Sequence, residues 1–506
     1  MTSLSAALDA GRRAAGSRNA AAHAAVAVAV ALVAGAARIV PVVRGGGLTG
    51  LGNYDDGVYY ATGTALVHGL LPYRDYLFLH PPGIVLLLAP FGLAGHDPTG
   101  LATARLAWML LGVANSVLVA RILRPVGLLA AAVGGLFYAT AFSAVYIEWT
   151  PLLEAPAQTC VLSAVLLLGR AERTGSPTRV GVLLAGALLG VSATFKIWGV
   201  VPVATVLVWL LVRRRWRTEW LATGAVAAVT LICLPFFVAA PTQMWRMVVI
   251  DQLGRGRSSS SLSVRWVGIL TLGLHPLAAS AAGFVAITVI VVPALLAVAF
   301  TVRQARLCVV LVLSLTTLLL ASPSWFLHYP GLATGPLAVA LGAGTGVLVD
   351  RLARWRTWVG WTGGVLAFVV LAVAAAPLTE LRLGKAFPAG ELATRVTLVG
   401  STCVTSDDPT ALVALDVLSS NLDHGCRFVA DLGGYSYQYA AERGAWIPRA
   451  HDQRWQQAYL DYLETGQTSL PFRYVATGSL GPQVKTAIAL WPVLAGSGRY
   501  VLREVR

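Results

Sequence analysis

Long apolar runs alternate with short arginine-rich segments over the first three quarters of the chain. Most of the runs approach or exceed the roughly 20 residues that a helix needs to cross a bilayer. After residue 377 polar and apolar positions mix, which indicates a small α/β domain. The runs predict an all-α polytopic bundle of about eleven transmembrane helices, at residues 20–43, 101–120, 126–145, 153–169, 180–195, 198–212, 219–240, 280–302, 307–322, 331–350 and 357–376.

The positions of the basic residues predict the orientation of the bundle. Lysine and arginine favour cytoplasmic loops, so we place in the cytoplasm the clusters Arg12/Arg13/Arg18, Arg121/Arg124, Arg170/Arg173/Arg179, Arg213/Arg214/Arg215/Arg217, Arg303/Arg306 and Arg351/Arg354/Arg356. The predicted parts are a cytoplasmic arm (1–19), a membrane module (20–376) and an extracytoplasmic domain (377–506). The chain is therefore expected in the plasma membrane with its N-terminus inside.

The apolar segment at residues 83–95 is too short to cross a bilayer. If it crossed, Arg121 and Arg124 would lie outside the cell. We therefore expect an amphipathic helix in the outer interface, within a first external loop of residues 44–100.

Composition agrees with a membrane protein. Hydrophobic residues make up 57% of the 506 positions and charged residues 12%, and the mean hydropathy is +0.70, which excludes an ordinary soluble domain. The net charge of +15 sits mostly in short loops that face anionic lipid, so it does not indicate nucleic acid.

The C-terminal region carries its own predicted elements. They are a helix at 409–422 preceded by Asp407 and Asp408 as caps, and strands at 427–430, 473–476 and 500–502. Cys403 and Cys426 either form a disulfide or are two free thiols.

Two adjacent aspartates, Asp55 and Asp56, begin a predicted helix that runs to His68 in the first external loop. Carboxylates often cap helix N-termini, and either residue alone fits that role. Adjacent helix positions point in different directions, so one aspartate can cap while the other faces a cleft. There it would serve as a general base toward an acceptor hydroxyl.

Cationic side chains occur in outer loops, where few are expected. Lys196 lies at a turn between two apolar runs. This position directs its ammonium to the same extracytoplasmic side of the membrane as Asp55. A guanidinium suits a phosphate bidentately, and the free N–H groups that follow His80 suit an anion. The predicted phosphate-binding residues are His80, Lys196, Arg255, Arg257, Arg74 and Arg105.

These residues also have ordinary structural explanations. His80 and Lys196 suit snorkelling at the interface, and the loop arginines suit salt bridges to Glu148, Glu154 or Asp251. An aromatic belt explains Trp325 and Tyr329 better than His328. The predicted substrate-pocket residues are Tyr59, Glu148, Glu154, His328 and Tyr329.

Six motifs stand out in the outer segments: Asp55-Asp56-Gly57-Val58-Tyr59, Pro72-Tyr73-Arg74-Asp75-Tyr76, His80-Pro81-Pro82-Gly83, Phe195-Lys196, Asp251-Gln252-Leu253-Gly254-Arg255 and His328-Tyr329. Together they resemble the bacterial GT-C membrane glycosyltransferases of the protein mannosyltransferase and aminoarabinose transferase type, glycosyltransferase family 39. The resemblance covers roughly residues 20–376.

The resemblance implies a polyprenyl-phosphate sugar donor, an active site in the outer leaflet and inverting transfer by direct displacement. The acceptor would be a cell-envelope glycan, lipid or protein. The first acid of the family's Asp-Glu pair acts as base, so Asp55 inherits that role. Asp56 replaces the usual glutamate, and His80 stands where many members carry lysine.

Two other classes of protein fit parts of the pattern. A transporter or lipid flippase also has many helices, but it usually keeps polar residues at the bilayer midplane and shows repeat symmetry. The other class is a noncatalytic membrane scaffold. Neither a Gly-rich phosphate loop nor a Walker pattern is present, so no cofactor is expected. The sugar, the acceptor and a need for divalent metal stay open.

Overall fold

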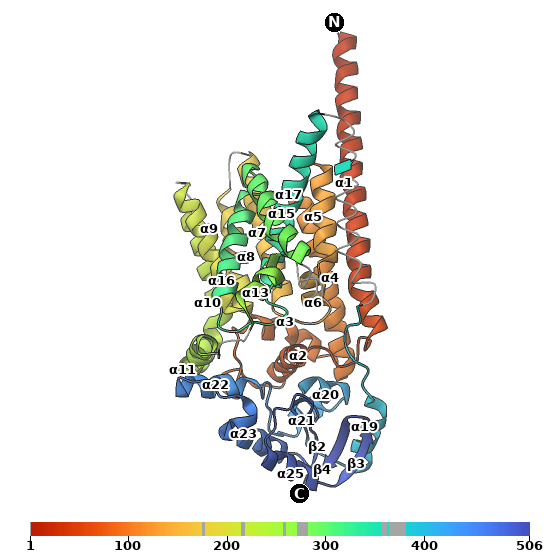
Figure 1. The fold of residues 1–506 in the computed structure, drawn as a ribbon, viewed down its shortest axis with the longest axis vertical. Helices are drawn as coiled ribbons and strands as arrows, with labels where there is room; N and C mark the ends of the chain where they lie inside the picture. The colour runs from red at the N-terminus through yellow and green to blue at the C-terminus, as the bar shows by residue number, and fades with distance from the viewer. Residues whose placement is uncertain are drawn as a thin grey trace.

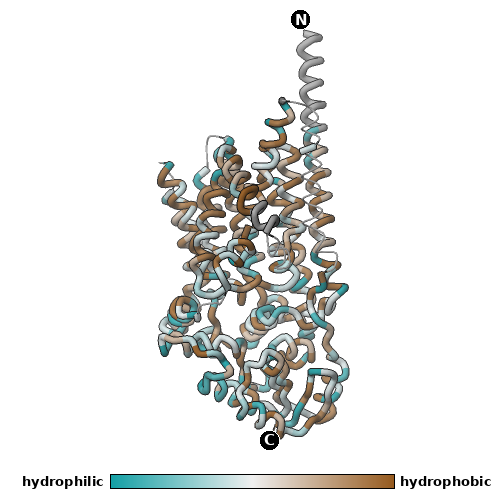
Figure 2. Tube along the Cα trace, in the orientation of Figure 1, coloured by the Kyte–Doolittle hydropathy of each residue, from teal (hydrophilic) through white to brown (hydrophobic). Residues whose placement is uncertain are grey.

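The computed structural model describes residues 2–174, 178–213, 218–256, 260–270, 282–355, 362–363 and 381–505. Figure 1 shows a tall helical bundle on one side and a C-terminal domain (residues 381–505) on the other, with α1 along the edge of the bundle. Apolar residues follow the helices of the bundle, whereas polar residues concentrate in the loops and the C-terminal domain (Figure 2).

The bundle contains the long apolar helices of the chain. They are α1 (Thr2–Arg44), α4 (Asp97–Leu123), α5 (Leu128–Thr140), α6 (Phe142–Glu148), α7 (Glu154–Thr174), α8 (Arg179–Phe195), α9 (Val200–Val212), α10 (Thr218–Ala239), α15 (Ala282–Thr301), α16 (Arg306–Ala321) and α17 (Gly331–Trp355). Each of the first ten predicted apolar runs thus coincides with a helix. The predicted run at 357–376 lies outside the described residues except for 362–363.

Four helices among the described residues are long and apolar enough to cross a membrane: Asn19–Arg44, Asp97–Leu123, Thr218–Ala239 and Gly331–Arg354. The pair α5 and α6, bent by 57°, gives a fifth if it is one span. Several other apolar helices have only 10–17 residues. The predicted count of about eleven spans is therefore not confirmed, because hydropathy detects an apolar helix but does not fix its length.

Glycines allow close packing of α8 against α10. A side chain at Gly186 or Gly190 would collide with the backbone of Leu221 or Ala225, and one at Gly224 with that of Leu183. Small residues let membrane helices approach closely. The van der Waals contacts that result hold the helices together, because there is no hydrophobic driving force between helices in lipid.

A buried ion pair joins α1 to the end of α6. Arg38 and Glu148 are fully buried and bonded to each other, and Arg38 also donates to the carbonyls of Ala34 and Ala139. Asn115 and Tyr138 each donate to Glu148 at 2.7 Å. Because its carboxylate is satisfied inside the bundle, Glu148 is not a pocket residue, and its predicted placement was wrong.

A layer of short helices separates the bundle from the C-terminal domain. Its elements are α2 (Tyr54–Val67), α3 (Gly83–Gly92), η1 (Ile197–Gly199), α11 (Pro241–Trp245), the π-helix η2 (Arg246–Ile250), α12 (Asp251–Leu253) and α13 (Leu262–Leu270). Helix α3 has 10 residues, about 15 Å, which is too short to cross a bilayer, as the sequence predicted.

The C-terminal domain contains one four-stranded sheet and short helices. Strand order is β1-β2-β4-β3, with β1 parallel to β2 and the other pairs antiparallel. The elements are α19 (Ala389–Leu398), β1 (Val404–Ser406), α20 (Pro409–Ala414), α21 (Leu418–Asp423), α22 (Gly434–Arg443), η4 (Arg449–His451), α23 (Gln453–Leu463), β2 (Thr468–Leu470), α24 (Arg473–Ala476), α25 (Pro482–Leu490), β3 (Val493–Ser497) and β4 (Tyr500–Glu504).

The structure corrects parts of the prediction for this domain. Residues 473–476 form helix α24. Residues 427–430 form no strand; Val429 and Ala430 are buried on irregular backbone. The helix at 409–422 is split into α20 and α21 at Asp416, whose φ is +59°. The strand at 500–502 and the Asp408 cap are confirmed, and Cys403 and Cys426 form a disulfide.

The layer and the C-terminal domain share one apolar core. Buried side chains from α2 and α3 belong to the same cluster as Leu412 of α20 and Leu470 of β2. A side chain at Gly57 would collide with Thr410, so glycine permits α2 to lie directly on α20. The C-terminal domain is thus held against the layer that carries Asp55.

Candidate functional site

The N-terminus of α2 is capped by Asn53. Its side-chain oxygen accepts a hydrogen bond from the backbone N–H of Asp55 at 3.2 Å, and its amide donates to the hydroxyl of Tyr146 at 2.9 Å. Because Asn53 satisfies the helix end, neither aspartate is needed as the cap. Their two side chains are free to take different roles.

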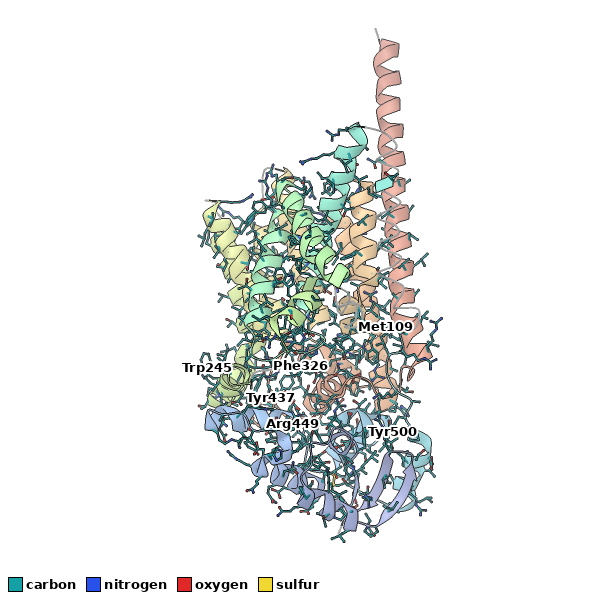
Figure 3. All side chains as sticks on the ribbon, viewed as in Figure 1. Met109, Trp245, Phe326, Tyr437, Arg449 and Tyr500 are labelled. Atoms are coloured by element: carbon teal, nitrogen blue, oxygen red, sulfur yellow. A yellow bond between two sulfur atoms is a disulfide. The ribbon has the colours of Figure 1, made fainter. Side chains whose placement is uncertain are left out.

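A pocket of about 290 Å³ lies where the bundle, the layer and the C-terminal domain meet. Ligand pockets commonly form at such junctions between domains. It is lined by Asn53, Tyr54, Asp55, Val58, Tyr59, Phe78, Leu79, His80, Lys196, Arg255, Phe326, His328, Tyr329, Asp431, Gly433, Tyr437, Arg449, Arg473, Tyr474, Thr477 and Ser479. Figure 3 shows Phe326 on the bundle side and Tyr437 and Arg449 on the facing side of the C-terminal domain.

Asp55 points into this pocket, where 32% of its side chain is exposed. Burial among protein groups raises the pKa of its carboxyl to about 6, and the nearby charge of Asp431 adds to that rise. Arg473 and Arg255 oppose the rise and Glu154 adds slightly to it. A carboxylate with a pKa near neutrality is suited to accept a proton from a substrate.

His328 lies between two carboxylates of the site. Its Nδ1 is 3.9 Å from Asp55, and its Nε2 is 3.7 Å from Glu154. Burial lowers the pKa of the imidazole to about 4. The negative charge of Glu154 raises this pKa, and the positive charges of Lys196 and Arg255 lower it further. His328 is therefore neutral at pH 7 and acts as a polar spacer between the two acids.

Lys196 is buried at the inner wall of the pocket. Its ammonium donates to Glu154 at 2.6 Å and lies 4.0 Å from the centre of the Tyr329 ring. The charge of Lys196 is thus largely balanced inside the protein. Glu154 therefore lies beside the pocket as the partner of Lys196.

Arg255 has a guanidinium without an acidic partner among the residues that the structure describes. It is 9% exposed, stacks over Tyr437 at 4.4 Å and Phe326 at 5.9 Å, and its Nε has no hydrogen bond. Arg246, in contrast, pairs with Glu442 and lies 3.8 Å from Asp251. The salt-bridge explanation thus holds for Arg246 and fails for Arg255.

His80 is held in place by three neighbours. Its Nε2 is 3.2 Å from the hydroxyl of Tyr59 and its Nδ1 is 3.4 Å from Gln252, while Tyr73 donates to its carbonyl at 2.6 Å. Burial, and then the charges of Arg255 and Lys196, lower the pKa of the imidazole. His80 therefore offers a neutral hydrogen-bonding group to the pocket.

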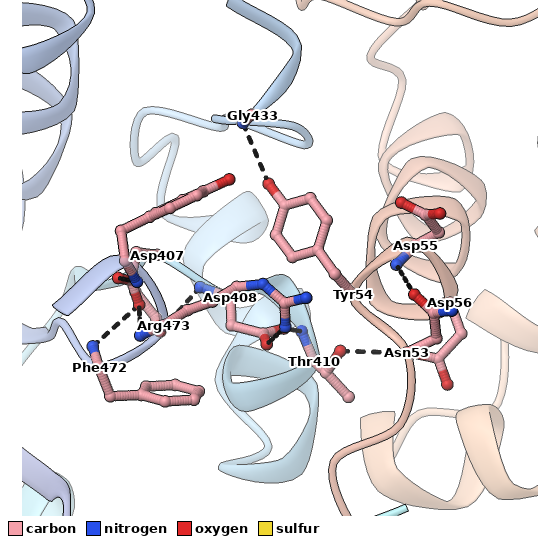
Figure 4. A network of polar contacts seen from close by, with 12 residues as sticks. Asn53, Tyr54, Asp55, Asp56, Asp407, Asp408, Thr410, Gly433, Phe472 and Arg473 are labelled. Atoms are coloured by element: carbon pink, nitrogen blue, oxygen red, sulfur yellow. Dashed lines mark hydrogen bonds and ion pairs between the residues drawn. The ribbon is translucent and has the colours of Figure 1, made fainter. Parts of the chain in front are cut away.

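The C-terminal domain forms the opposite wall. Tyr54 of α2 donates to Asp431 at 3.1 Å and accepts from the N–H of Gly433 (Figure 4). Arg473 bonds Asp408 at 2.8 Å and lies over the ring of Tyr54. These side chains were not predicted as site residues; their only sequence signal is that aromatic and basic residues recur between 431 and 474.

Several predicted site residues lie elsewhere. Asp56 is fully buried and bonded to Arg105 at 2.6 Å, and Thr150 and Thr410 donate to it as well. This pair braces α2 against α4 and α20, so neither member is available to a substrate. Arg74 is half exposed and pairs with its neighbour Asp75, and Arg257 lies outside the described residues.

No group of three or more His, Cys, Asp or Glu side chains is arranged to hold a metal ion within the described ranges. We assign no metal ligand. The pocket combines a carboxylate that titrates near neutrality, an unpaired guanidinium and many aromatic faces. Such a set can take a proton from a hydroxyl, bind an anion and stack against the apolar face of a sugar ring.

A sequence model of glycosyltransferase family 87 matches residues 78–323, just under half of the chain. No curated protein matches the chain by sequence. The narrower expectation of glycosyltransferase family 39 is not confirmed, since the matching model is that of family 87.

The fold is similar to several solved structures. Apo ArnT from Cupriavidus metallidurans is 16% identical with a TM-score of 0.57, over 96% of this chain and 98% of that chain. ArnT bound to undecaprenyl phosphate is 18% identical with a TM-score of 0.54 over the same shares. An oligosaccharyltransferase of Archaeoglobus fulgidus, in complex with zinc and sulfate, is 14% identical with a TM-score of 0.60, over 90% of this chain and 68% of that chain.

Proposed function

We propose, from the premise that this chain has the GT-C fold of membrane glycosyltransferases, that it moves a sugar from a polyprenyl-phosphate donor to a hydroxyl of a cell-envelope acceptor. Asp55 is the general base. The observation that carries the proposal is that Asp55, Lys196 and Arg255 line one pocket beside the membrane bundle. The neighbour bound to undecaprenyl phosphate supports a lipid-linked substrate.

The reaction is a single displacement at the anomeric carbon. The acceptor oxygen forms a bond to that carbon, the bond from the carbon to the phosphate oxygen breaks, and its electron pair leaves with the lipid phosphate. The acceptor proton passes to the carboxylate of Asp55. Attack opposite the leaving phosphate inverts the anomeric configuration. Because phosphate leaves readily, positioning and electrostatics supply most of the acceleration.

Arg255 is the main contact of the leaving phosphate in this proposal. Its guanidinium has no carboxylate partner in the described part of the chain. Its positive charge is therefore free to attract a bound phosphate. Lys196 adds charge but shares it with Glu154. His80 contributes a neutral hydrogen bond rather than a third positive charge.

We place the acceptor against the C-terminal wall. Asp431, Tyr437 and Arg449 line that side of the pocket and face Asp55 across it. The wall is proposed to be extracytoplasmic, in the plasma membrane, with the N-terminus inside. Two features support that orientation: the disulfide between Cys403 and Cys426, which suits an oxidising compartment, and the arginine clusters of the opposite loops.

The proposal is tested with the full chain in lipid nanodiscs, supplied with labelled polyprenyl-phosphate mannose or arabinose and an envelope extract as acceptor source. We expect transfer by the wild type, an inverted anomeric centre in the product, and loss of transfer in Asp55→Asn. Asp423→Asn, at an exposed aspartate outside the pocket, is the control and should stay active. A folded wild type that moves labelled lipid across vesicles without forming product would instead support a flippase.

A further inference from the structure

A second pocket lies at the opposite end of the bundle from the site described above. It has a volume of about 390 Å³ and is lined by Asn19, Ala20, His23, Arg124, Pro125 and Arg173. Three helices contribute to it: α1 with Asn19, Ala20 and His23, α4 with its C-cap Arg124 and the Pro125 that follows, and α7 with Arg173 of its last turn. Its polar side chains are two arginines, which only donate hydrogen bonds, and Asn19 and His23, which can donate or accept them; none is acidic.

The position of this pocket across the membrane follows from the length of α4. Its 27 residues span about 40 Å at ~1.5 Å per residue, which exceeds the ~30 Å of a hydrocarbon core. The first residue, Asp97, accepts hydrogen bonds from Ser419 of the C-terminal domain, so that end lies at the catalytic side. Arg124, the C-cap at the other end of α4, therefore lies at the headgroup level of the other membrane surface.

The two arginines of the pocket have no acidic partner among the described residues. The nearest acid along α7 is Glu172, which is already engaged by Arg213 and Arg303 at 3.9 and 4.0 Å. Both Arg124 and Arg173 are exposed at the pocket. Two guanidiniums on different helices, beside an imidazole and an amide, converge on one space without an anion to balance them.

A simpler explanation is that arginines at the ends of α4 and α7 interact with the negative ends of the helix dipoles. That explanation applies equally to Arg121 and Arg170, which lie one turn earlier on the same two helices and line no part of the pocket. The chain therefore offers a matched comparison. Only the pocket distinguishes the pair Arg124 and Arg173 from the pair Arg121 and Arg170.

We propose that Arg124, Arg173 and His23 bind the headgroup phosphate of an anionic phospholipid at this membrane surface. Basic pockets between membrane helices suit such headgroups, and each arginine adds to the attraction. The acyl chains of the lipid would lie along the apolar outer face of α1, where Val28 and Leu32 are exposed. This inference does not depend on the sugar transfer proposed above.

The test titrates the full chain in detergent micelles with dioleoyl phosphatidylglycerol and counts retained lipids by native mass spectrometry. We expect the wild type to retain phosphatidylglycerol in preference to dioleoyl phosphatidylcholine. Arg124→Gln/Arg173→Gln should weaken retention roughly 10- to 30-fold. Arg121→Gln/Arg170→Gln removes the same charge from the same surface and should retain the lipid as the wild type does.

A folding check accompanies the titration. Both variants should elute as single species and melt within a few degrees of the wild type. If the pocket variant does not, the single change Arg173→Gln is used in its place.

Three results would overturn the inference. Equal loss in the two double variants would mean general surface charge rather than a site. Equal retention of phosphatidylcholine and phosphatidylglycerol by the wild type would mean that no anion is recognised. Competition by inorganic phosphate at concentrations near those of the lipid would assign the pocket to a free anion.

Discussion

The carboxylate of Asp55 lies 3.9 Å from Nδ1 of His328, whose other nitrogen faces Glu154. The neutral imidazole keeps Asp55 apart from the pair formed by Glu154 and Lys196. Glu154, beside the pocket, is therefore ion-paired, while Asp55 faces the cavity with a pKa near neutrality.

Replacing Asp55 by asparagine should remove the base and keep the shape of the pocket. We expect the rate of transfer to fall by about 10²- to 10⁴-fold, the usual contribution of a general base. Affinity for the lipid-linked donor should change little, because Asp55 does not contact the phosphate in our proposal. Single-turnover rates and donor titrations with Asp55→Asn measure the two quantities separately; unchanged turnover would remove Asp55 from the mechanism.

The rate of transfer should depend on pH through Asp55. The base form is required, so the rate should rise as the pH rises through about 6, the pKa of the carboxyl. The charge of Asp431 raises that pKa, and Asp431→Asn should therefore shift the acidic limb of the pH profile to lower pH. A profile measured from pH 4.5 to 8.5 for both proteins checks the sign; a limb that moves upward would contradict the assignment.

Arg255 should determine donor affinity. Losing a charge-assisted hydrogen bond to phosphate typically weakens binding about 10- to 100-fold, and we expect that change in the KM for donor with Arg255→Gln. Arg255→Lys should recover part of the loss. Arg74→Gln is the control, because Arg74 is exposed and outside the pocket; an equal effect at Arg74 would mean that the two positions act through general charge.

Asp56 should matter for stability rather than for turnover. Removing one member of a buried ion pair commonly costs about 3–5 kcal/mol because the other charge is left alone. Asp56→Asn should thus lower the melting temperature and the folded yield, and Arg105→Gln should do the same. The double variant should be less destabilised than the sum of the two. Any folded fraction of Asp56→Asn should keep near-normal turnover, in contrast to Asp55→Asn.

The disulfide of the C-terminal domain should add measurable stability. It closes a separation of 23 residues, for which the loop-entropy relation gives about 3 kcal/mol. Cys403→Ser/Cys426→Ser should lower the melting temperature of the wild type, and dithiothreitol should do so only when both cysteines are present. On intact cells a membrane-impermeant thiol reagent should label these cysteines only after reduction; labelling without reduction would show free thiols.

The sequence predicted well what depends on local hydrophobicity. The first ten apolar runs locate the eleven described helices of the bundle, because the run at 126–145 overlaps both α5 and α6. The polar cluster around Asp55 locates the pocket. The roles of individual residues in the cluster were harder to predict, because Asp55 and Asp56 are adjacent and chemically alike. Only the positions of Arg105 and Thr410 show that Asp56 is the structural one of the two. Residues 49 and more positions away in sequence decide that difference.

The C-terminal wall was the least predictable part of the site. Strands of three to five residues give little alternating pattern. Tyr437 stacks with Arg255, and Arg449 lines the same pocket, only through the fold. Glu148 shows the opposite error. It looked like a pocket acid beside an outer loop, yet Arg38, more than a hundred residues earlier, binds it inside the bundle.

The pocket draws Asp55 from the layer and its facing wall from the C-terminal domain. In the proposed reaction, choice of acceptor and chemistry of displacement are thus encoded in different stretches of the gene. A lineage that exchanged residues 381–505 would then acquire a new recipient for its sugar and keep the machinery that breaks the donor bond.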